Sequence, residues 1–201
     1  MTQTPWGAPL EVGIALHVWT TPPDSPTRRE VYAYRGHLWQ REGEAMCRYR
    51  EADAASADAA ATMTTLRFSR DQVTLLRQGE IACRQVFRVG QTGRGLYRTP
   101  YGAFPMVWRC HGLEAEVLAG PEAYASGIPG VDDVQDAQAR LAWLRFSYDL
   151  ELGGQYLGRY EVHLDVRRSH FAEEGGMRDA DRGAAGRMAA GEADGEHGPG
   201  D

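Results

Sequence analysis

The sequence predicts an all-β protein, a single antiparallel up-and-down β-barrel of about 8–10 strands. Three observations lead to this fold class. Short segments alternate apolar and polar residues, which is the period of a half-buried strand. Glycine- or proline-containing turns of two or three residues join many of these segments. No segment carries a long helical period, and residues 70–117 read as strand, tight turn, strand four times over.

The chain of 201 residues divides into three predicted parts. Residues 1–10 form a flexible N-terminal arm, because they contain two prolines and no periodicity. Residues 11–167 form the barrel domain. Residues 168–201 form an acidic tail of mostly glycine, alanine and charged residues, which has too few large apolar side chains to order itself.

Composition excludes several classes of protein. Hydrophobic residues make up 42% and charged residues 25%, the ordinary usage of a soluble globular protein. No apolar run reaches the roughly 18 residues of a membrane helix, and the first residues lack the pattern of a signal peptide. We therefore expect a cytoplasmic protein with no membrane association. The net charge of −6 comes mainly from the tail, so the domain lacks the basicity typical of nucleic-acid binders.

The first predicted strand covers residues 11–20, where Val12, Ile14, Leu16 and Val18 share one face. A proline-rich segment ends it, because proline cannot join the interior of a sheet. The same alternation predicts the further strands, with the second bent at Gly36 and a surface loop over residues 51–61. Those strands lie at residues 29–40, 44–50, 63–69, 73–77, 81–89, 92–99, 103–110 and 113–117.

Turn residues separate these strands. Gly90 supplies the positive φ of a hairpin link at residues 90–91, and residues 99–102 match a type I turn. A further turn is expected at residues 111–112. Two glycines at 93 and 95 are typical of a bulge or a close approach of another group.

A long loop is predicted over residues 119–139, and the final hairpin follows it. One face of this hairpin carries Phe146, Tyr148, Tyr156 and Tyr160, and Gly153–Gly154 forms the turn. A meander of this length must close into a barrel, or fold over as a sandwich, to bury its apolar face.

The segments LRFSRDQVTLLRQGEI, FRVGQTGRGLYRTPYGAFPM and LRFSYDLELGGQYLGRYEVHLDV resemble the YwiB-like family of uncharacterised bacterial proteins. YRGHLWQREGEAMCRYRE fits the second hairpin of that family, and YxTPYGxF, which begins at Tyr97, is among its most specific parts. The resemblance covers residues 11–167 apart from the loops. It implies a calycin-like, lipocalin-type barrel and no known activity.

No catalytic constellation, metal motif or cofactor fingerprint is found. The six histidines lack metal-ligand spacing, and there is no P-loop, nucleophile elbow or dinucleotide motif. Cys47, Cys83 and Cys110 form no CxxC pair, so we expect three buried strand cysteines rather than a zinc site or disulfides. We predict no catalytic residue, no metal and no cofactor.

The barrel interior is the first candidate site. A mostly apolar lining with a few polar groups is the usual composition of a small-molecule pocket, although a filled core has the same composition. The candidate ligand-binding residues are Gln85, Phe87, Met106, Trp108, Tyr148, Tyr156 and Tyr160.

A strand face rich in arginine is the second candidate site. No acid occurs between Ile81 and Leu113, and aromatic residues are interleaved with the arginines. Such a face could bind an anion or single-stranded nucleic acid. Alternatively, the aromatic residues point inward while the arginines solvate the outside. The candidate residues are Arg84, Arg88, Arg94, Arg98 and Arg109.

Three classes of function follow, in order of preference. The first is a non-enzymatic binding module that holds a small apolar or amphipathic ligand in the barrel. The second is an interaction protein whose Arg/aromatic face binds an anion, RNA or a protein partner. An enzyme ranks last, because no catalytic site can be assembled from these residues.

Overall fold

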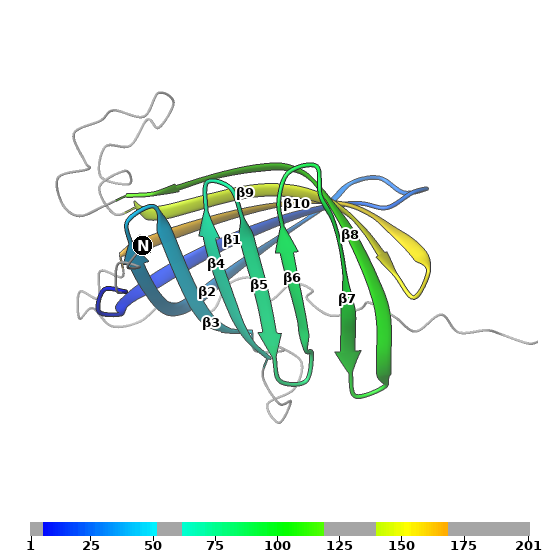
Figure 1. Ribbon diagram of the computed structural model, residues 1–201, viewed down its shortest axis with the longest axis horizontal. Coiled ribbons are helices and arrows are strands. Elements are labelled where there is room, and N and C mark those ends of the chain that lie inside the picture. Colours follow the sequence, from blue (N-terminus) through cyan, green and yellow to red (C-terminus); the bar gives the residue numbers. More distant parts are fainter. Residues whose placement is uncertain (1–5, 52–61, 119–139, 169–201) are drawn as a thin grey trace, which may run out of the picture.

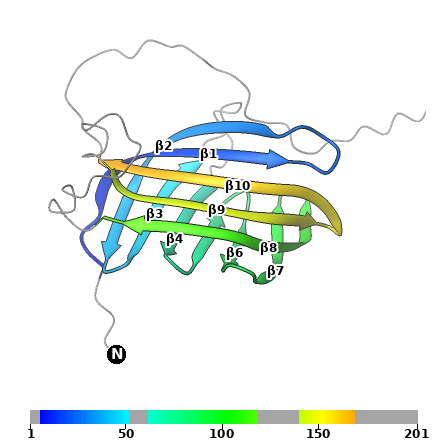
Figure 2. The same cartoon turned by 90° about the horizontal axis from the view of Figure 1, so that it is seen from above.

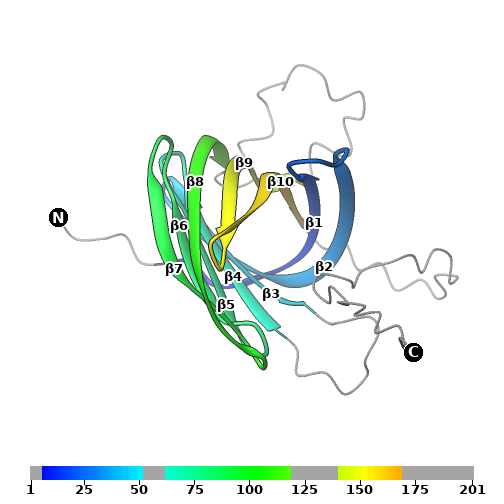
Figure 3. The same cartoon turned by 90° about the vertical axis from the view of Figure 1, so that its right-hand side faces the viewer.

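Ten antiparallel strands form one sheet that curls into a nearly closed barrel (Figures 1 and 3), which confirms the predicted fold class. The computed structural model describes residues 6–51, 62–118 and 140–168. The strands are β1 (Leu10–Thr21), β2 (Arg28–Arg41), β3 (Glu44–Glu51), β4 (Thr62–Ser69), β5 (Val73–Gln78), β6 (Cys83–Phe87), β7 (Thr92–Thr99), β8 (Gly102–Val117), β9 (Arg140–Leu152) and β10 (Gln155–Arg168).

The two predicted loops and the predicted tail lie, almost in full, outside the described residues, at 52–61, 119–139 and 169–201. Within the described ranges, no helix is long and apolar enough to cross a membrane.

The sheet is a meander whose first and last strands pair with each other. In β1, Leu16 lies opposite Leu164 of β10, and Thr20 lies opposite Tyr160. The order around the sheet is β6-β5-β4-β3-β2-β1-β10-β9-β8-β7. Its two ends are therefore β6 and β7, which are consecutive in the chain and lie side by side (Figure 3).

The seam between β6 and β7 has few backbone hydrogen bonds. Ala82 and Arg98 exchange two, with N···O distances of 3.0 and 2.9 Å. Further along, Trp108 of β8 donates from its indole Nε1 to the Val86 carbonyl oxygen at 2.9 Å. The indole lies over Gly93, where a Cβ would overlap the ring. A side chain thus replaces part of the missing strand ladder, and the predicted close approach at the glycines is confirmed.

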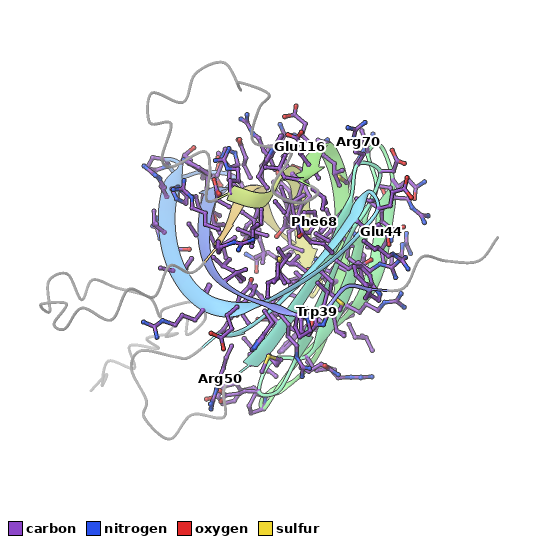
Figure 4. All side chains as sticks on the ribbon, turned by 90° about the vertical axis from the view of Figure 1, so that its left-hand side faces the viewer. Trp39, Glu44, Arg50, Phe68, Arg70 and Glu116 are labelled. Carbon is purple, nitrogen blue, oxygen red and sulfur yellow. The ribbon has the colours of Figure 1, made fainter. Side chains whose placement is uncertain are left out.

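The hydrophobic core lies inside the barrel. Phe87 packs against Phe146 and Tyr148, with ring centroids 4.9 and 4.8 Å apart. Figure 4 looks along the barrel and shows Phe68 inside the ring of strands, while Arg50 lies outside it. This division follows from the alternation of the strands, whose inward residues are mostly apolar.

The prediction that the three cysteines are buried in the strands is confirmed. Cys47, Cys83 and Cys110 are buried and form no disulfide. Burial raises the pKa of all three thiols above the ordinary value. They act as small apolar side chains in the core.

Two boundaries differ from the sequence predictions. The expected turn at residues 111–112 is wrong, because β8 continues through it with a β-bulge between Cys110 and Gly112. The arm is held at its end, since Gly7 N–H donates to the Gln40 carbonyl oxygen at 3.0 Å. Trp6 lies beneath the guanidinium of Arg41, whose carbon is 4.6 Å from the ring centroid.

Substitution of Gly93 tests the seam. Gly93→Ala should lower the free energy of unfolding by about 2–3 kcal/mol, because the added methyl group displaces the Trp108 indole. Gly13→Ala is the matched control, since nothing lies within 4 Å of a Cβ there. It should change stability by no more than about 0.5 kcal/mol. Urea unfolding of both variants measures the difference, and equal effects would contradict the role of Trp108.

Thiol labelling tests the burial of the cysteines. In the folded protein all three thiols should react far more slowly with iodoacetamide than in the urea-unfolded chain, because they are buried and protonated. Mass spectrometry counts the adducts over time. Rapid labelling of any one thiol under native conditions would contradict this part of the fold.

Candidate functional site

Six of the seven predicted ligand-binding residues face the inside of the barrel and are buried. They come from one strand at the seam, from the strand that pairs with the other seam strand, and from the two strands of the final hairpin. These residues are Gln85 and Phe87 of β6, Met106 and Trp108 of β8, Tyr148 of β9 and Tyr160 of β10.

Tyr156 does not line the interior. A register shift between Tyr156 and Gly158 adds one residue to β10, so Tyr156 lies opposite Glu151 on the outer face. Its side chain is 46% exposed, and its hydroxyl donates to Asp149 Oδ1 at 3.3 Å. Strict alternation along the strand predicted the wrong face, because a β-bulge reverses the direction of every side chain before it.

An inward arginine, Arg77, is the main feature that the sequence reasoning missed. It lies on β5 opposite Thr64 of β4 and Cys83 of β6, both buried. The strand alternation that turns Val73 inward turns Arg77 inward as well. The sequence thus contains the periodic signal for an inward Arg77, although a charged residue at the end of an apolar strand is usually solvated.

Arg77 pairs with a carboxylate inside the barrel. Its NH2 nitrogen lies 3.3 Å from Glu51 Oε1, and Thr64 Oγ1 donates to the same oxygen at 2.7 Å. The Nε–H of Arg77 is buried and has no hydrogen-bond partner among the described residues. The Arg77 side chain as a whole is 30% exposed, and that of Glu51 is 20% exposed.

Tyrosines surround this pair, and together they form the Arg77–tyrosine cluster. Tyr34 stacks on Tyr49 with ring centroids 4.7 Å apart, and Tyr148 stacks on Tyr160 at 5.3 Å. Tyr97 reaches the cluster from β7, across the seam. The cluster consists of Arg77, Glu51, Thr64, Tyr34, Tyr49, Tyr97, Tyr148 and Tyr160.

The tyrosines of the cluster are neutral donors and acceptors at physiological pH. Burial raises the pKa of Tyr34 to about 12, against an opposing effect of the Arg77 charge. Burial also raises the pKa of Tyr97 and Tyr148, again opposed by Arg77. Among the described residues, no hydrogen bond satisfies these three hydroxyls. Such a site can bind a polar group.

The cluster is poorly suited to covalent or metal chemistry. Cys83 is the nearest nucleophilic side chain, and burial raises its pKa, which keeps the thiol protonated and unreactive. The described part of the chain holds no group of three His, Cys, Asp or Glu that could bind a metal ion.

The predicted arginine face lies on the outside of β6, β7 and β8. All five arginines are exposed, and none has a carboxylate partner within 4 Å among the described residues. The aromatic residues interleaved with these arginines point to both faces of the sheet. Phe87 and Trp108 point inward and are buried, whereas Tyr101 is 93% and Phe104 is 39% exposed. The face is therefore basic, and its aromatic part is confined to the β7–β8 hairpin tip.

A basic groove of about 670 Å³ lies elsewhere on the outer surface, over β1 to β4. Arg35, His37, Trp39, Arg48 and Arg50 line it. The sequence reasoning missed this groove, because it joins residues of neighbouring strands that lie apart in the chain. Figure 4 labels two of the lining residues, Trp39 and Arg50, in its lower part, and Figure 2 shows β1 to β4 from above.

Comparison with known proteins agrees with the fold. Residues 24–121 match the family model described as a domain of unknown function, DUF1934. The crystal structure of YwiB protein from Bacillus subtilis superposes with a TM-score of 0.61 at 12% sequence identity. The superposition covers 82% of this chain and 95% of YwiB. No curated protein sequence matches the chain. The domain match and the shared fold confirm that this chain resembles the YwiB-like family, whose domain has no assigned function.

Proposed function

We propose that this chain is a non-enzymatic binding module, which holds a small amphipathic ligand inside the barrel. The polar end of the ligand lies at the Arg77–tyrosine cluster, and its apolar part lies against the core aromatic residues. This cytoplasmic, calycin-like carrier needs no cofactor. The single observation that supports it most is the buried Nε–H of Arg77, which has no partner among the described residues.

A buried donor without an acceptor is unusual in a folded protein. Most buried polar groups are hydrogen-bonded, and leaving one unpaired costs about 1–3 kcal/mol, with more for a charged group. The guanidinium has only donors, so its free N–H requires an acceptor from outside the described chain. A ligand that enters the barrel would supply it, and the partial exposure of Arg77 provides access.

The interior also offers the apolar half of an amphipathic site. Phe87 links the two regions, since it contacts Phe146 on one side and Tyr148 of the cluster on the other. Each ring buries a large apolar area, and their edges and faces suit a hydrocarbon or ring system. The phenol of Tyr148 and the ring of Phe146 therefore both contact Phe87, so polar and apolar groups lie close together in the interior.

Native mass spectrometry of gently purified protein tests this proposal. The protein should show a reproducible mass excess that disappears on denaturation. The double variant Arg77→Met, Glu51→Gln should lose it, because both charges of the pair are removed together and the polar end of the site disappears. Arg84→Met, on the outer face, is the matched control and should keep the excess. A bare mass for the parent protein, together with no uptake of added amphiphiles, would contradict the proposal.

We also propose a second function for the arginine face, as a contact for an anionic partner such as RNA. The supporting observation is the absence of carboxylate partners for all five arginines within the described chain. Two outer arginines of the final hairpin differ. Arg145 pairs with Glu161 at 2.7 Å, and Arg159 pairs with Asp149 at 3.0 Å.

Charge removal tests the second function. The triple variant Arg84→Gln, Arg88→Gln, Arg98→Gln should weaken the binding of a labelled single-stranded RNA, measured by fluorescence anisotropy. The slope of log K against log salt should fall by about 0.7 for each phosphate that the protein no longer neutralises. The control double variant Arg145→Gln, Arg159→Gln removes charges that are already paired and should have a smaller effect. Unchanged binding in the triple variant, or none in the parent, would contradict the second function.

A further inference from the structure

We infer that the ligand held at the Arg77–tyrosine cluster has an uncharged head group that accepts hydrogen bonds, such as an amide, ester or ketone carbonyl, rather than a carboxylate. This inference rests on the proposed function of the barrel interior. It depends on which charges of the cluster are already paired and which of its hydrogen-bond donors are still free.

The positive charge of Arg77 is already balanced. Glu51 lies 3.3 Å from its NH2 nitrogen, so the pair has no net formal charge. Within the described part of the chain, Glu51 is the only carboxylate within 4 Å of the Arg77 guanidinium. A ligand carboxylate would therefore meet Glu51 as a like charge in the same enclosed space, which disfavours its ionised form.

Loss of hydration adds to this cost. An anionic head group would lose its hydration without gaining a free counter-charge, and an unpaired buried charge is costly. A cationic head group would face the guanidinium directly.

The hydrogen-bonding groups of the cluster lead to the same conclusion. Glu51 Oε1 already accepts from Thr64 and lies against Arg77. The Arg77 Nε–H is buried and free. The hydroxyls of Tyr97 and Tyr148 make no hydrogen bond within the described part of the chain. A carbonyl oxygen has two lone pairs and no charge, so it can accept from the guanidinium and from one phenol together.

A matched set of ten-carbon amphiphiles tests this inference without any mutation. N-methyldecanamide, decanoate and decylammonium are compared by displacement of Nile red from the full-length protein at pH 7.5. The amide should bind at least about 10-fold more tightly than decanoate, a difference of about 1.4 kcal/mol. Decylammonium should bind most weakly of the three.

Glu51→Gln provides the second arm of the experiment. It removes the charge that balances Arg77 and should increase the affinity for decanoate by about 10-fold or more, while the amide changes by less than about 3-fold. Glu114→Gln removes a carboxylate from the exposed outer face and is the matched control, with all affinities unchanged. Circular dichroism confirms that both variants fold. If Glu51→Gln does not fold, the comparison of ligands on the parent protein still decides.

The outcomes distinguish the inference about the head group from the proposal that the barrel binds a ligand. Tighter binding of decanoate than of the amide by the parent protein would overturn the inference about the head group and leave the barrel as a binding site. Unchanged decanoate affinity in a folded Glu51→Gln variant would overturn it as well. No displacement by any of the three compounds, with no mass excess in native spectra, would instead overturn the proposed function itself.

Discussion

The barrel depends on how Trp108 closes it. A sheet with two free ends leaves unpaired backbone groups at both, and full closure normally removes them. Here the Ala82–Arg98 pair supplies two hydrogen bonds at one end of the seam, and the Trp108 indole supplies one further along. The indole fits because Gly93 has no side chain beneath it. A larger residue at position 93 would displace the Trp108 indole and separate β6 from β7 at this point.

The seam and the Arg77–tyrosine cluster are parts of one arrangement. Arg77 lies opposite Cys83, next to the Ala82–Arg98 pair, and Tyr97 approaches it from the other side of the seam. The seam is therefore closed by backbone at its polar end and by an aromatic side chain at its apolar end. The described interior side chains follow the same order, from the Arg77–tyrosine cluster to Phe87 and Trp108, and this order supports the amphipathic ligand that we propose.

The strands could be predicted from the sequence because each depends on a local period of two residues. The turn at Gly90 could also be predicted, since its φ of 76° requires glycine. The location of the seam could not. Nothing local in the sequence distinguishes the link between β6 and β7 from an ordinary hairpin, because the distinction arises when Trp108, more than a dozen residues later, lies over Gly93.

The candidate site was predicted only in part, for a related reason. Six interior residues, among them Tyr148 and Tyr160, followed from alternation, and Tyr156 failed where a bulge interrupted it. Tyr34, Tyr49 and Tyr97 were not predicted to face the interior. Arg77 lies on the predicted face, but its function depends on Glu51, which is 26 positions earlier and two strands away. A charge pair formed across a sheet leaves no pattern in the sequence of either strand.

Thr64 sets the geometry of the pair between Glu51 and Arg77. Its hydroxyl lies between Glu51 and Arg77 in the sheet and donates to the same Glu51 oxygen that faces the guanidinium. The carboxylate is therefore held by two donors on one oxygen, and it contacts Arg77 through the NH2 group alone. A bidentate contact would have used two N–H groups of the guanidinium, as many arginine–carboxylate pairs do. Because Thr64 holds Glu51 in this position, the Nε–H of Arg77 remains available inside the barrel.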